Sequence, residues 1–273
     1  MSSGAVTWRV GAVEITRVED PGFDLTLSQD EETRKALAAA EWLSPWSVTE
    51  DLSLRIGSSA TIVRTPSAVV LVDPFLAFDD VARLGPRLSA LRNAGVEADD
   101  VDIVVNTHVD GMGVNILADG SPTFPEASYI LPTAELTALR RGDHPDLGGH
   151  PDTAGFVRLA DEGLATGIAS DERLLPGVWL RESPGHAAGH LAVWIDSGGA
   201  SAVITGHLFL HPAQIADPTI VTGDHDPALL VATRRSLLAR CAADDTLLLG
   251  PLFAAPGGGH VRDDGHGGWK LEL

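Results

Sequence analysis

The sequence predicts one continuous fold in which strands and helices are mixed. Two short runs of apolar, β-branched residues, 69–72 and 103–105, are typical of strands buried inside a sheet. Longer stretches over 29–43, 79–94 and 226–243 combine good helix formers with apolar residues at helical spacing. No linker separates these segments, and 273 residues with 44% hydrophobic content can bury a substantial core.

The N-terminal part predicts strands interrupted by one helical segment. Residues 7–18 alternate apolar and polar side chains, as one or two short strands do. The helix over 29–43 ends before Pro45, and a hairpin follows over 52–64 and 69–73. Asp73 lies at the end of that hairpin, where it can cap the turn before Pro74.

One segment is expected to extend the single domain, which we assign to residues 1–273. Residues 19–50 are predicted to form a helical and loop extension near the mouth of a pocket. Trp42 and Trp46 flank the end of its helix. Their large rings either pack the segment onto the body of the domain or line that mouth.

The rest of the chain continues the mixture of helices and strands. His144 and His150 lie in a loop at 142–153 that is rich in helix breakers, and both are expected to be solvated. The expected elements are helices over 79–94, 133–141 and 226–243, and strands ending near 105, 130, 182, 195, 206 and 249.

The net charge and the cysteine content limit which binding partners and which cellular location we expect. The net charge is −19 at neutral pH, so nucleic acid and anionic membrane surfaces would be repelled. Cys241 is the only cysteine, which excludes an intrachain disulfide and a metal site built from several thiolates. No apolar run reaches the roughly 18 residues that a spanning helix needs, and the first residues have neither a basic region followed by an apolar core nor a cleavage signature, so we expect no secretory signal. We expect a soluble, cytoplasmic protein whose partner is a small molecule.

Polar residues gather where the strand at 103–105 ends. The segment that follows reads Asn-Thr-His-Val-Asp and contains His108 and Asp110. These two residues are two positions apart, so in an extended chain their side chains point the same way and converge on one point. Taken alone, the segment is more typical of a hydrogen-bonded structural histidine than of a functional one.

Further segments carry histidines at turns in a consistent order. They are 184–190 (PGHAAGH), 205–207 (TGH), 211–214 (HPAQ) and 250–260 (GPLFAAPGGGH). Together with Thr107-His108 and Asp73-Pro74, they resemble the metallo-β-lactamase superfamily, and in particular its lactonase and organophosphate-hydrolase branch. The resemblance extends over about residues 50–273. It implies an α+β fold, the four-layer αβ/βα sandwich, with two facing sheets, helices outside and the metal loops along one edge.

The resemblance also implies where metal would bind, and it gives Asp73 a second possible role, in which its carboxylate orients one of the metal ligands. The first metal of the superfamily takes three histidines and a bridging aspartate, and the matching residues are His108, Asp110, His186 and His207. The other ligands of the second metal match Met112, Gly113 and Leu252, none of which can hold a divalent ion. We therefore expect the chain to bind at most one metal. Three imidazoles and a carboxylate suit zinc, and two histidines with one carboxylate would also suit iron(II).

Two of the four first-metal residues have exchanged identities relative to the superfamily pattern. Asp110 stands where the pattern has histidine, and His207 stands where it has the bridging aspartate. Asp, Glu, His and Cys are together fewer than one residue in five, so random change would rarely leave both positions able to bind metal. The exchange fits one preserved centre, or a hydrogen-bonded Asp110–His207 pair in a metal-free cavity.

These residues support three hypotheses about function. The first is a hydrolase with one metal, acting on an ester, lactone or thioester of a hydrophobic small molecule. The second is a metal-free lyase, isomerase or cyclase in which His207 acts as a base oriented by Asp110. The third is a binding protein that retains the fold without catalysis.

The exchanged pair yields a testable prediction. Asp110→His leaves the centre without an anionic ligand, and His207→Asp places two carboxylates together, so each single change should weaken metal binding. The double change should bind one metal better than either single variant, with a coupling of roughly 0.5–3 kcal/mol. Metal affinities of the four proteins test this, and strictly additive losses would show that the two positions do not share a centre.

Overall fold

The computed structural model describes the chain except for residues 1–4, 26–30, 76–83, 110–114, 118 and 145–150. Over the described residues, the strands form two seven-stranded sheets. The first sheet contains, in spatial order, β1 (Ala5–Val10), β2 (Val13–Leu25), β3 (Leu54–Arg64), β4 (Val69–Val72), β5 (Ile103–Val105), β6 (Ser128–Pro132) and β7 (Ala165–Ile168). The second contains, from β14 back to β8, the strands β14 (Trp269–Glu272), β13 (Gly258–Asp263), β12 (Leu247–Leu249), β11 (Ala200–Ile204), β10 (Leu191–Ser197), β9 (Val178–Glu182) and β8 (Glu172–Leu175).

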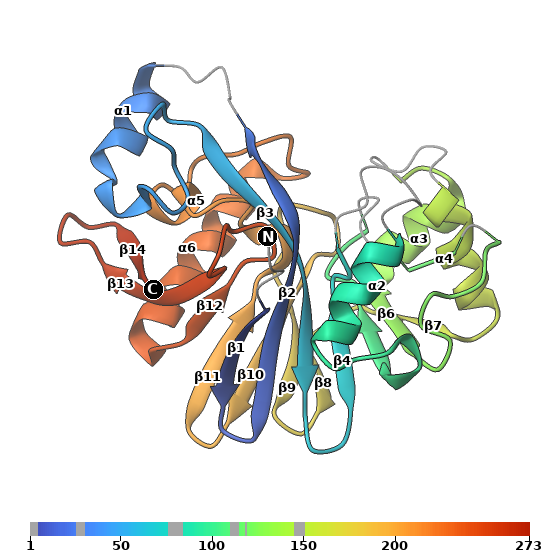
Figure 1. Ribbon diagram of the computed structural model, residues 1–273. Coiled ribbons are helices and arrows are strands. Elements are labelled where there is room, and N and C mark those ends of the chain that lie inside the picture. The colour runs from blue at the N-terminus through green and yellow to red at the C-terminus, as the bar shows by residue number, and fades with distance from the viewer. Residues whose placement is uncertain (1–4, 26–30, 76–83, 110–114, 118, 145–150) are drawn as a thin grey trace.

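The two sheets face each other and helices cover both outer faces (Figure 1). Helices α2 (Leu84–Asn93), α3 (Thr133–Arg141) and α4 (Pro151–Asp161) lie beside the first sheet, and α6 (Pro227–Asp244) lies beside the second. The short helices are α1 (Glu31–Ala39) and α5 (Ala213–Ala216), and the 3-10 turns are η1 (Glu41–Leu43), η3 (Ala98–Asp100) and η4 (Gly206–Leu208). This arrangement confirms the predicted α+β fold with four layers.

The layers are held by separate apolar clusters. The inner faces of the sheets meet in a cluster that includes Val13, Ile15 and Val72 from one sheet and Leu180 and Ile204 from the other. On each outer face, buried apolar side chains pack between a sheet and its helices. The central strands are therefore apolar on both faces, which explains the continuous apolar runs in the sequence.

The N-terminal segment differs in part from its prediction. Strand β2 continues through Leu25, so residues 19–25 belong to the first sheet instead of a helical and loop extension. The helix predicted over 29–43 is α1 followed by the turn η1. The rest of the segment packs through a further apolar cluster, which contains Leu37, Leu43, Val48, Leu54, Ile56, Ala213 and Leu252. The longer strand is explained by its pairing with β3, which local alternation in the sequence does not reveal.

The two tryptophans of this segment have a packing role. Trp46 donates its indole N–H to the carbonyl of Trp42 at 2.8 Å, and the ring centroids are 6.3 Å apart. Both rings are partly buried against the cluster between α6 and the second sheet.

No helix in the described part of the chain is long and apolar enough to cross a membrane.

Arg17 on β2 joins the first sheet to the loop after β12 in the second. Its side chain is buried, and its guanidinium donates to Ser59 Oγ and to the carbonyls of Pro251 and Phe253. It also forms an ion pair with Glu19 at 2.7 Å. Burial lowers the pKa of Arg17, and the charge of Glu19 opposes that shift.

We predict that Arg17→Met lowers the free energy of unfolding by about 2–4 kcal/mol, because buried carbonyls lose their donor. The matched control is Arg9→Met, which removes an exposed arginine paired with Glu14 and should change stability by less than about 0.5 kcal/mol. Urea unfolding of both variants measures the difference. Equal effects would show that Arg17 does not connect the sheets energetically.

Candidate metal centre

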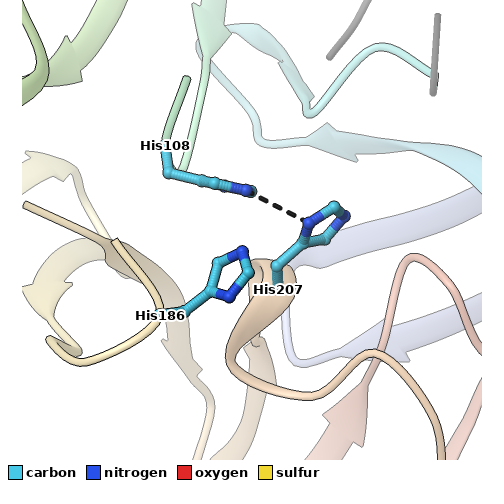
Figure 2. A group of neighbouring side chains, drawn as sticks. All are labelled: His108, His186 and His207. Carbon is cyan, nitrogen blue, oxygen red and sulfur yellow. Dashed lines mark hydrogen bonds between the residues drawn. The ribbon is translucent and has the colours of Figure 1, made fainter. Parts of the chain in front are cut away.

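Three histidines from separate parts of the chain converge at one edge of the sandwich (Figure 2). His108 follows β5, His186 lies in the turn between β9 and β10, and His207 lies in η4 after β11. One ligand nitrogen from each ring lies within 4.8 Å of the other two. His108 Nε2 and His207 Nδ1 are 3.1 Å apart. The structure thus brings together three of the four residues predicted to hold a metal.

Strand pairing explains why these segments meet. Parallel pairing of β5 with β4 and β6 places the residues after β5 at the end of the first sheet, and parallel pairing of β11 with β12 does the same in the second. A hydrogen bond of 2.8 Å from Leu191 N to Thr107 O then connects the start of β10 to the loop after β5. The loops that carry His108 and His186 are therefore joined directly through the backbone.

Asp73 holds the residue that precedes His108. Its buried carboxylate accepts hydrogen bonds from the backbone N–H and the hydroxyl of Thr107, both at 2.8 Å. Thr107 Oγ1 in turn lies 3.1 Å from His108 Nδ1. Burial raises the pKa of Asp73, whereas the nearby His108 and the bonds from Thr107 oppose this shift. Of the two predicted roles, the contacts place Asp73 behind His108, with Thr107 between them.

Asp224 is a residue of the candidate site that the sequence analysis missed. Its Oδ1 lies 2.7 Å from His186 Nδ1, and its Oδ2 accepts a 2.7 Å hydrogen bond from Thr222 N. Burial opposes ionisation of Asp224, but the bonds from His186 and Thr222 keep its pKa below the ordinary value. It lies 38 residues after His186 in a loop. The only signal in the sequence is its polar surroundings, Thr222 to Asp226.

The environment keeps His186 neutral at neutral pH. Burial lowers its pKa to about 4, and the hydrogen bond to Asp224 only partly opposes this. The neutral ring donates Nδ1–H to the carboxylate, so the lone pair lies on Nε2. A metal-binding histidine commonly has a carboxylate at its other ring nitrogen, which fixes the tautomer and the ring orientation.

Gly206 is required where the second sheet approaches the first. Its φ is +53°, and a Cβ at this position would overlap Thr107 Oγ1 and His190 Nε2. His190 is buried, with Nδ1 2.8 Å from Ser183 Oγ, and its ring centroid is 5.1 Å from that of His108. The glycine therefore permits the close contact that brings His207 next to His108.

The three imidazoles fit a single divalent ion. Zinc–nitrogen distances of about 2.0–2.1 Å in tetrahedral geometry place two ligand nitrogens about 3.3 Å apart. The 3.1 Å between His108 Nε2 and His207 Nδ1 is close to that value, and the third nitrogen is within reach. The neutral state of His186 leaves it able to bind metal. The donor set present therefore suits the implied metal.

The other predicted residues have different outcomes. Asp110, Met112, Gly113 and His150 lie outside the described residues. Leu252, which matches a ligand of the second metal in the superfamily pattern, is buried in the apolar cluster described above. The prediction that His144 is solvated was wrong, because His144 is buried and its Nε2 lies 2.8 Å from Glu135 Oε2. A partner on α3, nine residues away, compensates for its burial.

His211 is a structural residue, although it continues the superfamily pattern. Its Nε2 lies 2.9 Å from the carbonyl of Ser47, and its Nδ1 accepts a 3.0 Å hydrogen bond from Ala213 N. These contacts fix the neutral tautomer with the proton on Nε2. Burial lowers the pKa of His211 to about 4. It thereby connects the N-terminal segment to the loop after His207.

Comparisons with known proteins support the fold. No family model and no curated protein sequence matches this chain. Among solved structures, hydrolase AbOPH of the beta lactamase superfamily has a TM-score of 0.83 and 20% identity, covering 99% of this chain and 97% of that one. AidC, a dizinc quorum-quenching lactonase in complex with a product, N-hexanoyl-L-homoserine, has a TM-score of 0.79 and 18% identity, with 99% and 98% covered.

A third structure agrees with these two. It is a probable metal-dependent hydrolase from Staphylococcus aureus, with a TM-score of 0.76 and 15% identity, covering 97% of this chain and 99% of that one. All three align with nearly the whole chain. The chain therefore has the metallo-β-lactamase fold, as the sequence motifs predicted.

His211 yields a prediction about pH. Its pKa is lowered from 6.5 to about 4 in the folded protein, so the unfolded chain binds more protons between these values. The contribution of His211 to stability is therefore complete above pH 6.5 and is lost as the pH falls toward 4. We expect His211→Gln to reduce the loss of stability between pH 7 and 4 by about 1–3 kcal/mol. Urea unfolding of both proteins across this range tests it, and parallel curves would contradict it.

Proposed function

We propose that this metallo-β-lactamase-fold chain is a hydrolase with one metal ion, held by His108, His186 and His207. Asp110 is the proposed fourth ligand, on the basis of the exchange between positions 110 and 207. The observation that carries the proposal is the convergence of three imidazole nitrogens within 4.8 Å, at the edge where loops of both sheets meet. The proposed substrate is an ester, lactone or thioester of a hydrophobic small molecule.

Zinc is the proposed ion, because its preferred nitrogen ligands and coordination match this donor set. Iron(II) also suits two histidines with a carboxylate. When bound, zinc would supply a Lewis acid and lower the pKa of a coordinated water toward about 7, the chemistry needed to hydrolyse an acyl bond at neutral pH. Four protein ligands would crowd a tetrahedral ion, so one of them would have to stay off the metal or the coordination expand to five.

The chain supplies orientation and the correct protonation state. Asp224 accepts a hydrogen bond from His186 Nδ1–H, and this bond directs the Nε2 lone pair of His186 to the cluster. Thr107, held by Asp73, contacts His108 Nδ1 and leaves His108 Nε2 for the centre. Because burial lowers the pKa of His186 to about 4, that ring is neutral at neutral pH. The ligands are therefore arranged by neighbouring side chains on both sides of the cluster.

The apolar surroundings of Leu252 support one ion instead of two. AidC is described as a dizinc lactonase, and the superfamily pattern has a metal-binding histidine where this chain has Leu252. In this chain the leucine is 6% exposed and packs against apolar residues of the N-terminal segment. Binding of a second ion would require a donor from elsewhere in the chain.

The proposed substrate class rests on the solved structures that this chain resembles and on the net charge of the chain. AidC was crystallised with N-hexanoyl-L-homoserine, the product of opening an acyl-homoserine lactone, and AbOPH is named a hydrolase. The net charge of −19 disfavours approach of strongly anionic substrates such as nucleotides. An uncharged acyl ester or lactone with an apolar chain meets both conditions.

The test combines metal content with turnover. Protein purified without added metal should contain close to one zinc or iron per chain by elemental analysis. Hydrolysis of an aryl ester or an N-acyl homoserine lactone should stop after chelation and return with zinc. His186→Ala should reduce both the metal content and the melting temperature, because an ion that binds only the folded state stabilises it. The matched control is His260→Ala, which changes a partly exposed histidine paired with Asp245.

Each alternative function has its own outcome. Two ions per chain would contradict the mononuclear centre. Turnover that survives chelation would favour the metal-free enzyme in which His207 and Asp110 act as base and orienting group. Absence of turnover in a broad screen of esters, lactones and thioesters would favour a binding protein. Full metal content in His186→Ala would exclude that histidine as a ligand.

A further inference from the structure

Helix α6 contacts both loops that carry histidines of the second sheet. Thr233 donates its hydroxyl to the carbonyl of Pro184 at 2.9 Å, in the turn that carries His186. At the start of the same helix, Asp226 N donates to Gly185 O at 2.8 Å. The helix also approaches Gly185 so closely that a Cβ there would overlap the backbone of Leu230. The turn before His186 is therefore fixed against α6.

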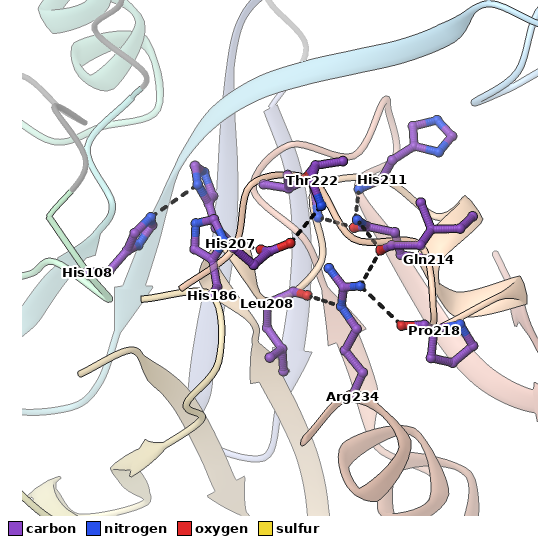
Figure 3. A network of polar contacts seen from close by, with 12 residues as sticks. His108, His186, His207, Leu208, His211, Gln214, Pro218, Thr222 and Arg234 are labelled. Carbon is purple, nitrogen blue, oxygen red and sulfur yellow. Dashed lines mark hydrogen bonds and ion pairs between the residues drawn. The ribbon is translucent and has the colours of Figure 1, made fainter. Parts of the chain in front are cut away.

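The next residue along the helix holds the other loop (Figure 3). Arg234 is fully buried and donates Nε–H to the carbonyl of Leu208 at 2.6 Å. Its Nη1 donates to the carbonyls of Pro218 and Ile220, at 3.2 and 2.6 Å. Gln214 shares the carbonyl of Ile220 through a 3.1 Å bond from its Nε2. One guanidinium thus joins two separate parts of the segment 208–220.

The positions of these carbonyls connect Arg234 to the metal centre. Leu208 directly follows His207. Ile220 lies shortly before Asp224, whose carboxylate contacts His186 and is itself held by Thr222 N. Burial lowers the pKa of Arg234 to about 10, with the charge of Asp224 opposing the shift, so the side chain remains a cation at neutral pH. A protonated guanidinium can donate along several fixed directions at once, which a single apolar side chain cannot do.

We propose that Thr233 and Arg234 are positioning residues, which set the places of His186 and His207 relative to each other. The proposal rests on the metal centre described under the proposed function. Thr233 holds the turn of His186, and Arg234 holds both the residue after His207 and the loop of Asp224. Because the two side chains are adjacent on one helix, their spacing is rigid. The two histidines are thereby arranged before any ion binds.

Arg234→Met tests the proposal, because it keeps most of the side-chain volume and removes every donor. Arg234→Lys retains the charge and should restore part of the effect. Thr233→Val removes only the bond to Pro184. The exposed neighbour Arg235→Met is the matched control on the same helix. Leu238→Ala is a second control, which lowers stability through the buried apolar face of α6 and removes no hydrogen bond to either loop.

Two readouts separate positioning from stability. The first is cobalt(II) affinity, by competition with a chelator, together with the visible absorption of the bound ion. Arg234→Met should weaken binding about tenfold to a hundredfold and change the spectrum, Thr233→Val should weaken it less, and Arg234→Lys should lie between Met and wild type. Both controls should stay within about threefold of wild type. The second readout is the set of imidazole nitrogen resonances of the metal-free protein, which should shift in Arg234→Met and remain unchanged in Leu238→Ala.

The outcomes distinguish this proposal from the proposed function. If wild type and Arg234→Met bind cobalt equally well, the positioning role is overturned and the proposed metal centre still stands. Equal losses in Arg234→Met and Leu238→Ala, in proportion to their loss of stability, also overturn it. If wild type binds no metal, the hydrolase proposal fails. The imidazole resonances then decide the role of Arg234, because a shift only in its variants supports it and unchanged resonances overturn it.

Discussion

The structure depends first on the contact between the inner faces of the two sheets. Valine, isoleucine and leucine side chains from both sheets fill this layer, and nearly all are withdrawn from water. Burial of apolar surface on this scale is the main favourable term in folding. It also fixes which sheet edges lie together. The loops after β5 and β11 can meet only because the strands that lead into them are pressed against each other.

Polar contacts then connect the sheets where they meet. The bond between Leu191 and Thr107 joins the loops beside the histidines, and Arg17 joins β2 to the carbonyls of Pro251 and Phe253. Each of these groups is buried, so loss of its partner would leave an unsatisfied donor or acceptor in the core. The candidate centre therefore lies on a rigid junction, which is a requirement for ligands that must hold one geometry.

The electrostatics of the interior differ from those of the surface. The chain has a net charge of −19, yet the cluster at the candidate centre consists of histidines, and burial keeps His186 neutral. Buried cations at Arg17 and Arg234 are satisfied largely by backbone carbonyls instead of carboxylates. Arginine suits this role because its planar guanidinium stays protonated and donates in several directions. At Arg17 and Arg234, buried charge thus serves to hold loops in place.

The local sequence alone predicted those helices and strands whose ends are marked by residues such as proline and glycine. The helix expected over 133–141 is α3, bounded by Pro132 and Gly142, and the strand expected at 103–105 is β5. The turn that carries His186 was predicted because glycine and proline mark such turns locally. Tertiary contacts decided other boundaries, such as the extension of β2 to Leu25 and the start of α4 at Pro151, inside a segment expected to be a loop.

The candidate site shows the same division. The resemblance of their motifs to the superfamily pattern identified His108, His186 and His207, but only the packing of the sheets placed their nitrogens within 4.8 Å. Asp224 and Arg234 lie in segments with no motif, and His144 stands in a polar loop although it is buried against Glu135. The roles of these side chains come from partners distant in the sequence. A local pattern records propensity and spacing, whereas burial and hydrogen-bond partners are decided only when separate segments pack together.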